Sequence, residues 1–112
     1  MSFDLKEWPR AWSDFASEVR GAEGEAKLLT WMEKLAQEGP RLRRNVRPLG
    51  DGLFELKIQA NRVLYGFHRG AVVVVLCFIK KKQRDQSAVN EARRRLKIVR
   101  AGGQEMSDAA IH

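Results

Sequence analysis

The sequence predicts an α+β domain. A helical hairpin, with room for a short edge strand before it, packs on an antiparallel β meander of three to four strands, and a helix follows at the C-terminus. Apolar residues recur at helical spacing before residue 40 and after residue 86, but they alternate in steps of two between residues 53 and 79. The 112 residues, 44% apolar and 31% charged, fit one domain, which we place at residues 1–103. Residues 104–112 have no apolar period, so we expect a mobile tail there.

Two helices are predicted in the N-terminal part of the chain. The first begins near Pro9, whose fixed φ suits a first turn, and the second runs from Glu25 to Glu38 and ends at Gly39. Before them, alternation around residues 3–5 permits a short edge strand. The apolar positions at helical spacing are Trp8, Trp12, Phe15 and Val19 in the first helix, and Leu28, Trp31 or Met32, and Leu35 in the second.

The meander is predicted from residue 53 onward, after Pro48, Gly50 and Gly52 mark the end of the helical pattern. Residues 54–58 and 62–68 alternate between apolar and polar side chains, whereas residues 71–79 are apolar on both parities and should form a central strand. The dipeptide Arg69-Gly70 fits a two-residue hairpin turn. The final helix follows, capped by Asp85 or Ser87, with Val89, Ala92, Leu96 and Val99 on one stripe.

The register of the hairpins predicts which side chains share a face. A turn at Arg69-Gly70 pairs Arg62 with Cys77, and a turn at residues 60–61 pairs Lys57 with Leu64. One face then becomes an apolar core surface that the helical hairpin covers. The opposite face collects Glu55, Lys57, Gln59, Arg62 and His68 on a floor of small or branched residues, and the same parity directs Lys81 toward it.

This charged face has two interpretations. Several cations on one face repel each other, and a bound phosphate would relieve that repulsion, which favours a polyanion site. Alternatively, it is an ordinary solvated face of an antiparallel sheet. The net charge is +7, and its distribution is uneven: residues 1–40 hold five Lys or Arg against eight Asp or Glu, and residues 41–112 hold sixteen against six. The C-terminal part therefore carries a basic field that attracts RNA, DNA or an acidic protein.

Other functional classes have little support in the sequence. Cys77 lies in an apolar run, so we interpret it as structural. The histidines His68 and His112 form no cluster at metal-ligand spacing, so no metal is expected. Glycine-rich nucleotide loops are missing, so we expect no cofactor. The longest apolar run is far shorter than a membrane helix, and the N-terminus lacks a signal core, which predicts a cytoplasmic protein that does not engage membranes.

Three segments together resemble the RelE/HigB-type toxins, particularly their phage-derived branch. They are Leu49-Gly50-Asp51-Gly52-Leu53-Phe54-Glu55-Leu56-Lys57, Arg62-Val63-Leu64-Tyr65 and Cys77-Phe78-Ile79-Lys80-Lys81-Lys82. The resemblance covers residues 28–98 and implies a RelE-like fold. It also implies the toxin of a type II toxin–antitoxin pair: a metal-independent endoribonuclease that cleaves mRNA on the ribosome and is neutralised by a cognate antitoxin.

The resemblance also implies roles for individual residues. Lys57, Arg62 and Lys81 match the family's basic catalytic positions, and the register places the same three on one face. The 2′-hydroxyl of the RNA would attack the adjacent phosphorus, with Lys57, His68 or Glu55 as the base. Contacts to RNA are expected from His68, Lys80, Lys82, Arg84, Arg43 and Arg44. The alternatives are a non-catalytic ParE-like inhibitor that binds a protein target, and a non-toxic phage-derived nucleic-acid-binding protein.

Overall fold

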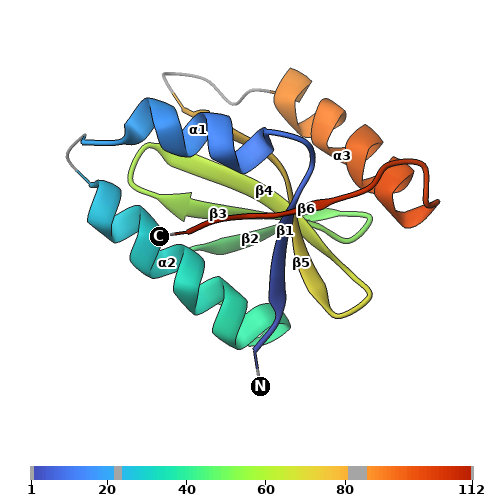
Figure 1. Cartoon of the computed structure of the whole chain (residues 1–112), viewed down its shortest axis with the longest axis horizontal. Coiled ribbons are helices and arrows are strands. Elements are labelled where there is room, and N and C mark those ends of the chain that lie inside the picture. The colour runs from blue at the N-terminus through green and yellow to red at the C-terminus, as the bar shows by residue number, and fades with distance from the viewer. Residues whose placement is uncertain (1, 22–23, 81–85, 112) are drawn as a thin grey trace.

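The computed structural model describes residues 2–21, 24–80 and 86–111, and it confirms the predicted α+β class (Figure 1). Three helices surround one mixed sheet. In chain order the elements are β1 (Asp4–Glu7), α1 (Ala11–Val19), α2 (Glu25–Glu38), the short 3-10 helix η1 (Gly39–Arg41), β2 (Val46–Gly50), β3 (Leu53–Ile58), β4 (Asn61–His68), β5 (Ala71–Ile79), α3 (Gln86–Arg100) and β6 (Ser107–Asp108). Within the described ranges, no helix is long and apolar enough to cross a bilayer.

The sheet has the strand order β2-β3-β4-β5-β1-β6. Strands β2 to β5 form an antiparallel meander, which begins earlier than the predicted residue 53. The arginine-rich segment 41–47, which we call the basic connector, leads into its first strand, β2. The N-terminal strand exists, but it is not an edge strand: β1 pairs in parallel with β5 on one side and antiparallel with β6 on the other. The apolar strand β5 therefore lies inside the sheet, as its sequence predicts.

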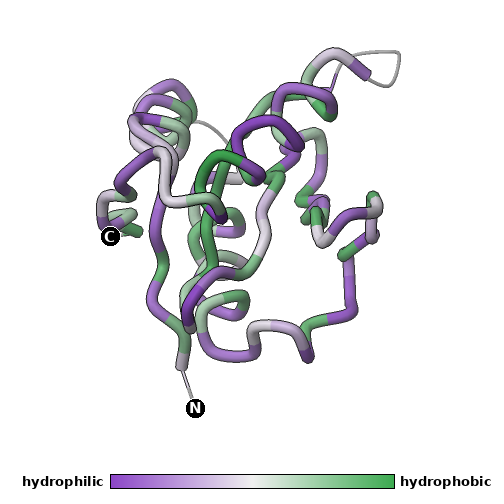
Figure 2. Tube along the Cα trace, turned by 90° about the vertical axis from the view of Figure 1, so that its right-hand side faces the viewer, coloured by the Kyte–Doolittle hydropathy of each residue, from purple (hydrophilic) through white to green (hydrophobic). Residues whose placement is uncertain are grey.

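Both faces of the sheet are covered by helices. Helices α1 and α2 pack on the first face through Trp12, Phe15, Leu28, Met32 and Leu35, all at most 5% exposed. Helix α3 packs on the second face, where Val89, Ala92, Leu96 and Val99 meet Leu53, Leu64, Val73 and Val75. Hydrophilic and hydrophobic stretches alternate along the chain, as elements with one buried side require (Figure 2). The expectation of an open polar face is therefore wrong where α3 lies over it.

A β-bulge corrects the predicted register between β4 and β5. The turn at Arg69-Gly70 is as predicted, with φ of 50° and 76°, but the pairing shifts between Leu64 and Tyr65. Beyond the shift, Arg62 lies opposite Phe78 rather than Cys77. Because a one-residue shift exchanges the faces of a strand, Leu76 and Phe78 pack with α3 and Cys77 packs on the first face. Such a bulge cannot be recognised in the sequence of an all-apolar strand, because the residues that point to either face are equally hydrophobic.

The β3–β4 hairpin also differs from the predicted register. Ile58 pairs with Asn61, so residues 59 and 60 form the turn, and Gln59 adopts a φ of 56°. This register is displaced by two residues from the expected one, which preserves the faces and brings Lys57 directly opposite Arg62.

The first helix begins later than predicted because a glutamate from β1 caps it. Glu7 is 4% exposed, and its Oε1 accepts hydrogen bonds from the backbone N–H groups of Trp12, at 3.0 Å, and Ser13, at 3.1 Å. These N–H groups belong to the first turn and have no partner within the helix. Trp8 lies outside the helix and packs toward α3, where Arg95 lies 5.2 Å from its ring centroid.

The C-terminal residues pack against the sheet, which argues against the mobile tail that we expected. Ser107–Asp108 pairs with β1, and the backbone N–H of Ala109 donates to the carbonyl of Leu5 at 2.9 Å. The indole N–H of Trp12 donates to the carbonyl of Ala110 at 2.8 Å. Met106, Ala109 and Ile111 also pack against the core, but they follow no regular apolar period, so a search for such periods misses the segment.

Candidate nucleic-acid interface

Four neighbouring strands place one cation each at the same end of the second face. Arg47 lies on β2, Lys57 on β3 and Arg62 on β4, and Lys80 follows the end of β5. Arg47 pairs with Glu55, and Lys57 pairs with Arg62, so these side chains share a face. They line a shallow groove of about 230 Å³ formed by Asn45, Val46, Arg47, Glu55, Lys57, Arg62 and Lys80, which we call the basic groove.

Arg62 is the fixed member of the basic groove. Only 6% of the residue is exposed, and its Nη1 donates to the carbonyl oxygens of Gln59, at 2.6 Å, and Asn61, at 3.0 Å. These bonds hold the guanidinium beneath the β3–β4 turn. An arginine held in this way presents a positive charge in a set position and loses little side-chain entropy when an anion binds.

Arg47, Lys57 and Lys80 are exposed, and backbone hydrogen bonds hold the main chains of the two lysines in place. The N–H of Lys57 donates to the carbonyl of Asn45, and the N–H of Lys80 donates to the carbonyl of Ala60, both at 2.8 Å. Within the described residues, neither ammonium group has an ion pair or hydrogen bond. Glu55 is the one carboxylate among the lining residues, so cations outnumber it by four to one.

His68 does not join the basic groove. It lies at the opposite end of β4, opposite Ala71, and lines another depression together with Asp4, Lys6 and Arg69. The convergence of His68 with Lys57 and Arg62 is therefore a wrong prediction. The physical reason is strand length, because His68 is six residues from Arg62 on the same strand, about 20 Å at 3.3 Å per residue.

The other predicted site residues are placed as follows. Arg43 and Arg44 are exposed on the connector immediately before Asn45, at the margin of the basic groove. Lys81, Lys82 and Arg84 lie outside the described residues. With the bulge in β5, Lys80 has the parity of Phe78 and Arg62, so Lys80 takes the position on the second face that the simple register assigns to Lys81.

Arg47 is a groove residue that the sequence reasoning did not single out. It belongs to the basic connector by composition, but the alternation of Val46, Arg47, Pro48 and Leu49 before the Gly50–Gly52 turn is the signal of a strand. Recognising β2 would have placed Arg47 opposite Glu55, on the same face as Lys57.

The side chains of Cys77 and Tyr65, which could otherwise take part in catalysis, are unsuited to it. Burial, with a further contribution from the Glu7 carboxylate, raises the pKa of the Cys77 thiol, which stays protonated and fits a packing role. Burial also raises the pKa of Tyr65, which is 1% exposed and stacks on Phe54 at 5.7 Å between ring centroids. In the part of the chain that the structure describes, no three His, Cys, Asp or Glu side chains are grouped as metal ligands.

The fold and the groove define a small α+β protein with a cationic surface site. A fixed guanidinium beside exposed ammonium groups can orient a phosphate and stabilise charge that develops on it. A family model described as "Phage derived protein Gp49-like (DUF891)" matches residues 13–97, well over half of the chain. The chain therefore belongs to the Gp49-like family of phage-derived proteins, a membership compatible with the toxin of a toxin–antitoxin pair. No curated protein sequence gives a significant match.

Proposed function

We propose that this protein is the RelE/HigB-type toxin of a toxin–antitoxin pair and that it cleaves RNA in the basic groove. The observation that carries the proposal is the placement of Lys57 directly opposite the buried Arg62, with Arg47 and Lys80 on the flanking strands. A groove with this excess of positive charge attracts a polynucleotide backbone. Membership of the phage-derived Gp49-like family agrees with the proposal.

The proposed reaction needs no group beyond the RNA and the protein. The 2′-oxygen attacks the adjacent phosphorus, the bond to the 5′-oxygen breaks, and the products are a 2′,3′-cyclic phosphate and a 5′-hydroxyl. Arg62 is suited to the charge that develops on the phosphoryl oxygens, because its guanidinium is already held in place. Preorganised donors of this kind need no reorganisation at the moment of reaction.

The proton from the 2′-hydroxyl requires a base in the same groove. Glu55 and Lys57 both line it, whereas His68 lines the depression at the other end of β4. The geometry favours Glu55 or Lys57 as the base and the other as a positioning group. The proton taken from the 2′-hydroxyl then goes to the 5′-oxygen as its bond to phosphorus breaks, which gives the 5′-hydroxyl product. The proposal implies three partners: the mRNA, the ribosome and a cognate antitoxin. It also requires that the protein act in the cytoplasm.

The test is induced expression in bacteria, with RNA ends mapped and growth followed. We expect the wild-type protein to arrest growth and to create mRNA breaks with 5′-hydroxyl ends. Lys57→Ala should lose most of both effects. The matched control is Lys27→Ala, which removes an exposed lysine from α2, on the other side of the sheet. Growth arrest with intact mRNA would replace the nuclease with an inhibitor that acts by binding. Unchanged cleavage by Lys57→Ala would overturn the site.

A further inference from the structure

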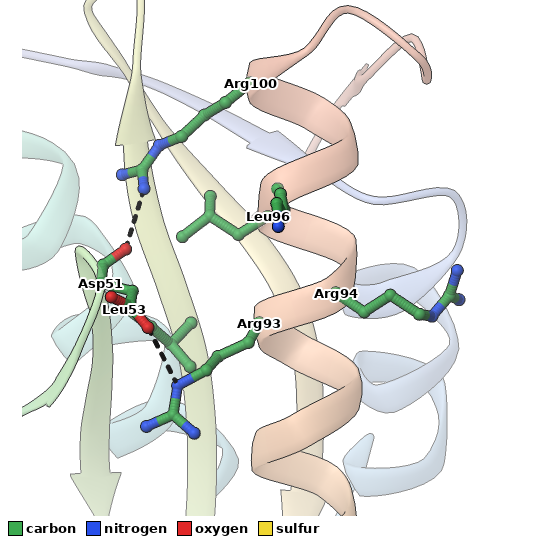
Figure 3. Close-up of a pocket in the computed structure, with 7 residues that line it drawn as sticks. Asp51, Leu53, Arg93, Arg94, Leu96 and Arg100 are labelled. Atoms are coloured by element: carbon green, nitrogen blue, oxygen red, sulfur yellow. Dashed lines mark hydrogen bonds and ion pairs between the residues drawn. The ribbon is translucent and has the colours of Figure 1, made fainter.

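A second cationic depression lies between helix α3 and the turn that joins β2 to β3, and we call it the α3 pocket (Figure 3). Its volume is about 470 Å³, twice that of the basic groove. Leu53 and Leu96, which are 1% and 2% exposed, contribute an apolar floor. The lining residues are Asp51, Leu53, Arg93, Arg94, Leu96, Lys97 and Arg100. Arg94 is paired with Glu91, so three cations remain against the one carboxylate of Asp51.

Two arginines of the α3 pocket are held in place by the backbone. Arg93 donates through Nη2 to the carbonyl of Leu49, and Arg100 donates to the carbonyls of Asp51, at 3.0 Å, and Phe67, at 3.3 Å. Figure 3 shows both side chains reaching from α3 toward the turn, while Arg94 extends away from it. The two guanidiniums are therefore positioned before any ligand arrives, which lowers the entropic cost of binding.

Among the described residues, two cations of the α3 pocket, Arg93 and Lys97, lack part of the hydrogen-bond or ion-pair partners that they could have. Arg93 Nε is buried and makes no hydrogen bond within the described structure, and the nearest carboxylate oxygen, Asp51 Oδ2, is 3.9 Å away. The Asp51 side chain is 89% exposed, and a solvated pair at this distance contributes little free energy. Lys97 is exposed and has no ion pair in the described part of the chain. An additional anion would give Lys97 a partner and could reach the exposed part of the Arg93 guanidinium, whose side chain is 35% exposed.

Strand β2 connects the α3 pocket to the basic groove. Arg47 lines the groove, and Leu49 and Asp51, further along the same chain segment, bind the arginines of the pocket. Arg47 and Asp51 are four positions apart, a distance of at most about 13 Å along the chain. Both sites open on the second face of the sheet, so one extended polyanion can reach from one site to the other.

We propose that the α3 pocket binds a phosphate group of a single-stranded RNA whose neighbouring nucleotides occupy the basic groove. The inference rests on the proposed function for the identity of the ligand, and it adds a binding site that the cleavage reaction does not require. The cations of the two sites follow one another beside β2: Arg47 lies on the strand, and Arg93 of α3 binds the carbonyl of the strand's Leu49. A succession of cations of this kind suits a nucleic-acid backbone. Planar guanidiniums over an apolar floor also suit the stacking of a base.

The experiment measures RNA binding by fluorescence anisotropy with a labelled, 2′-O-methylated oligouridylate, which lacks the attacking hydroxyl. Lys97→Ala is the test variant, because Lys97 has no contact to lose in the described structure, and Lys27→Ala is the matched control on α2. Release of about 0.7 counterion for each single-strand phosphate contact predicts an affinity loss of about fivefold at ~0.1 M salt for one lost contact. The slope of log affinity against log salt should fall by about 0.7.

A length series separates the two sites. A dinucleotide fills the basic groove but cannot reach the α3 pocket, so Lys97→Ala should bind it as tightly as the wild type, while Lys57→Ala should weaken the binding of both ligands. If the wild-type protein binds no RNA, the proposed function fails. If Lys57→Ala weakens binding and Lys97→Ala behaves as Lys27→Ala, only the pocket inference fails. Binding of oligoglutamate, but not of RNA, in a Lys97-dependent manner would make the ligand an acidic protein and overturn the proposal.

Discussion

Replacing Arg62 with alanine should destabilise the fold as well as remove a charge from the basic groove. The residue is 6% exposed, and its Nη1 makes two hydrogen bonds to the carbonyls of the β3–β4 turn. Hydrogen bonds from a charged group contribute about 1.5–3 kcal/mol to stability. Since both carbonyls lie in a turn that water can partly reach, we expect a net loss of about 2–3 kcal/mol. For a chain of this length, such a loss lowers the melting temperature by about 8–12 °C.

The assay is urea denaturation followed by circular dichroism, with thermal melts as a second readout. Lys57→Ala is the comparison, because Lys57 lies opposite Arg62 but is exposed, and its loss should change the free energy of unfolding by less than about 0.5 kcal/mol. Arg62→Lys keeps the charge and loses the two-acceptor geometry, so its stability should lie between the wild type and Arg62→Ala. Equal midpoints for wild type and Arg62→Ala would show that the turn contacts contribute nothing.

Three further predictions concern the packing of α3 on Gly66, the cap of α1 by Glu7 and the ion pairs of Glu91. Gly66→Ala should destabilise by about 1–3 kcal/mol, because its new Cβ would lie 2.6 Å from Leu96 Cδ2; a calorimetric melt equal to that of the wild type would contradict the packing of α3. Glu7→Ala should cost about 1–2 kcal/mol in urea denaturation, since the first turn of α1 loses its cap, and Glu7→Gln should cost less. Hydrogen bonds from two neighbouring arginines lower the pKa of Glu91 to about 2. The ionised Glu91 therefore stabilises the fold above the pKa of the unfolded state, near 4.5, and this stabilisation is lost as the pH falls toward 2. The difference in melting temperature between the wild type and Glu91→Gln should disappear over that pH range.

The parts of the fold that depend on local periodicity were predictable, and those that depend on long-range pairing were not. The stripe formed by Val89, Leu96 and Val99 predicts α3, and Arg69-Gly70 predicts its turn. The bulge in β5 could not be foreseen, because Val75 and Leu76 are both apolar and either parity satisfies a sheet that is covered on both faces. The position of β1 beside β5 likewise depends on a pairing between residues more than sixty positions apart in the sequence.

The candidate site was predictable in part for the same reason. Lys57 and Arg62 belong to one hairpin, and a register error of two residues does not change their face. Lys80 and Lys81 follow the bulge, where an error of one residue exchanges the face of every later side chain. The burial of Arg62 was also unforeseen, since charged residues are rarely buried unless they are paired.

The internal position of β1, between β5 and β6, constrains how the chain can fold during synthesis. Its parallel partner, Ala71–Val74, is made more than sixty residues later, and its other partner is Ser107–Asp108, near the end of the chain. Until those segments leave the ribosome, both edges of this strand are unpaired. Pairings of such high sequence separation slow folding. In the order of synthesis, α1, α2 and the first strands of the meander are made first, and the sheet is completed only after residues 107–108 have been added.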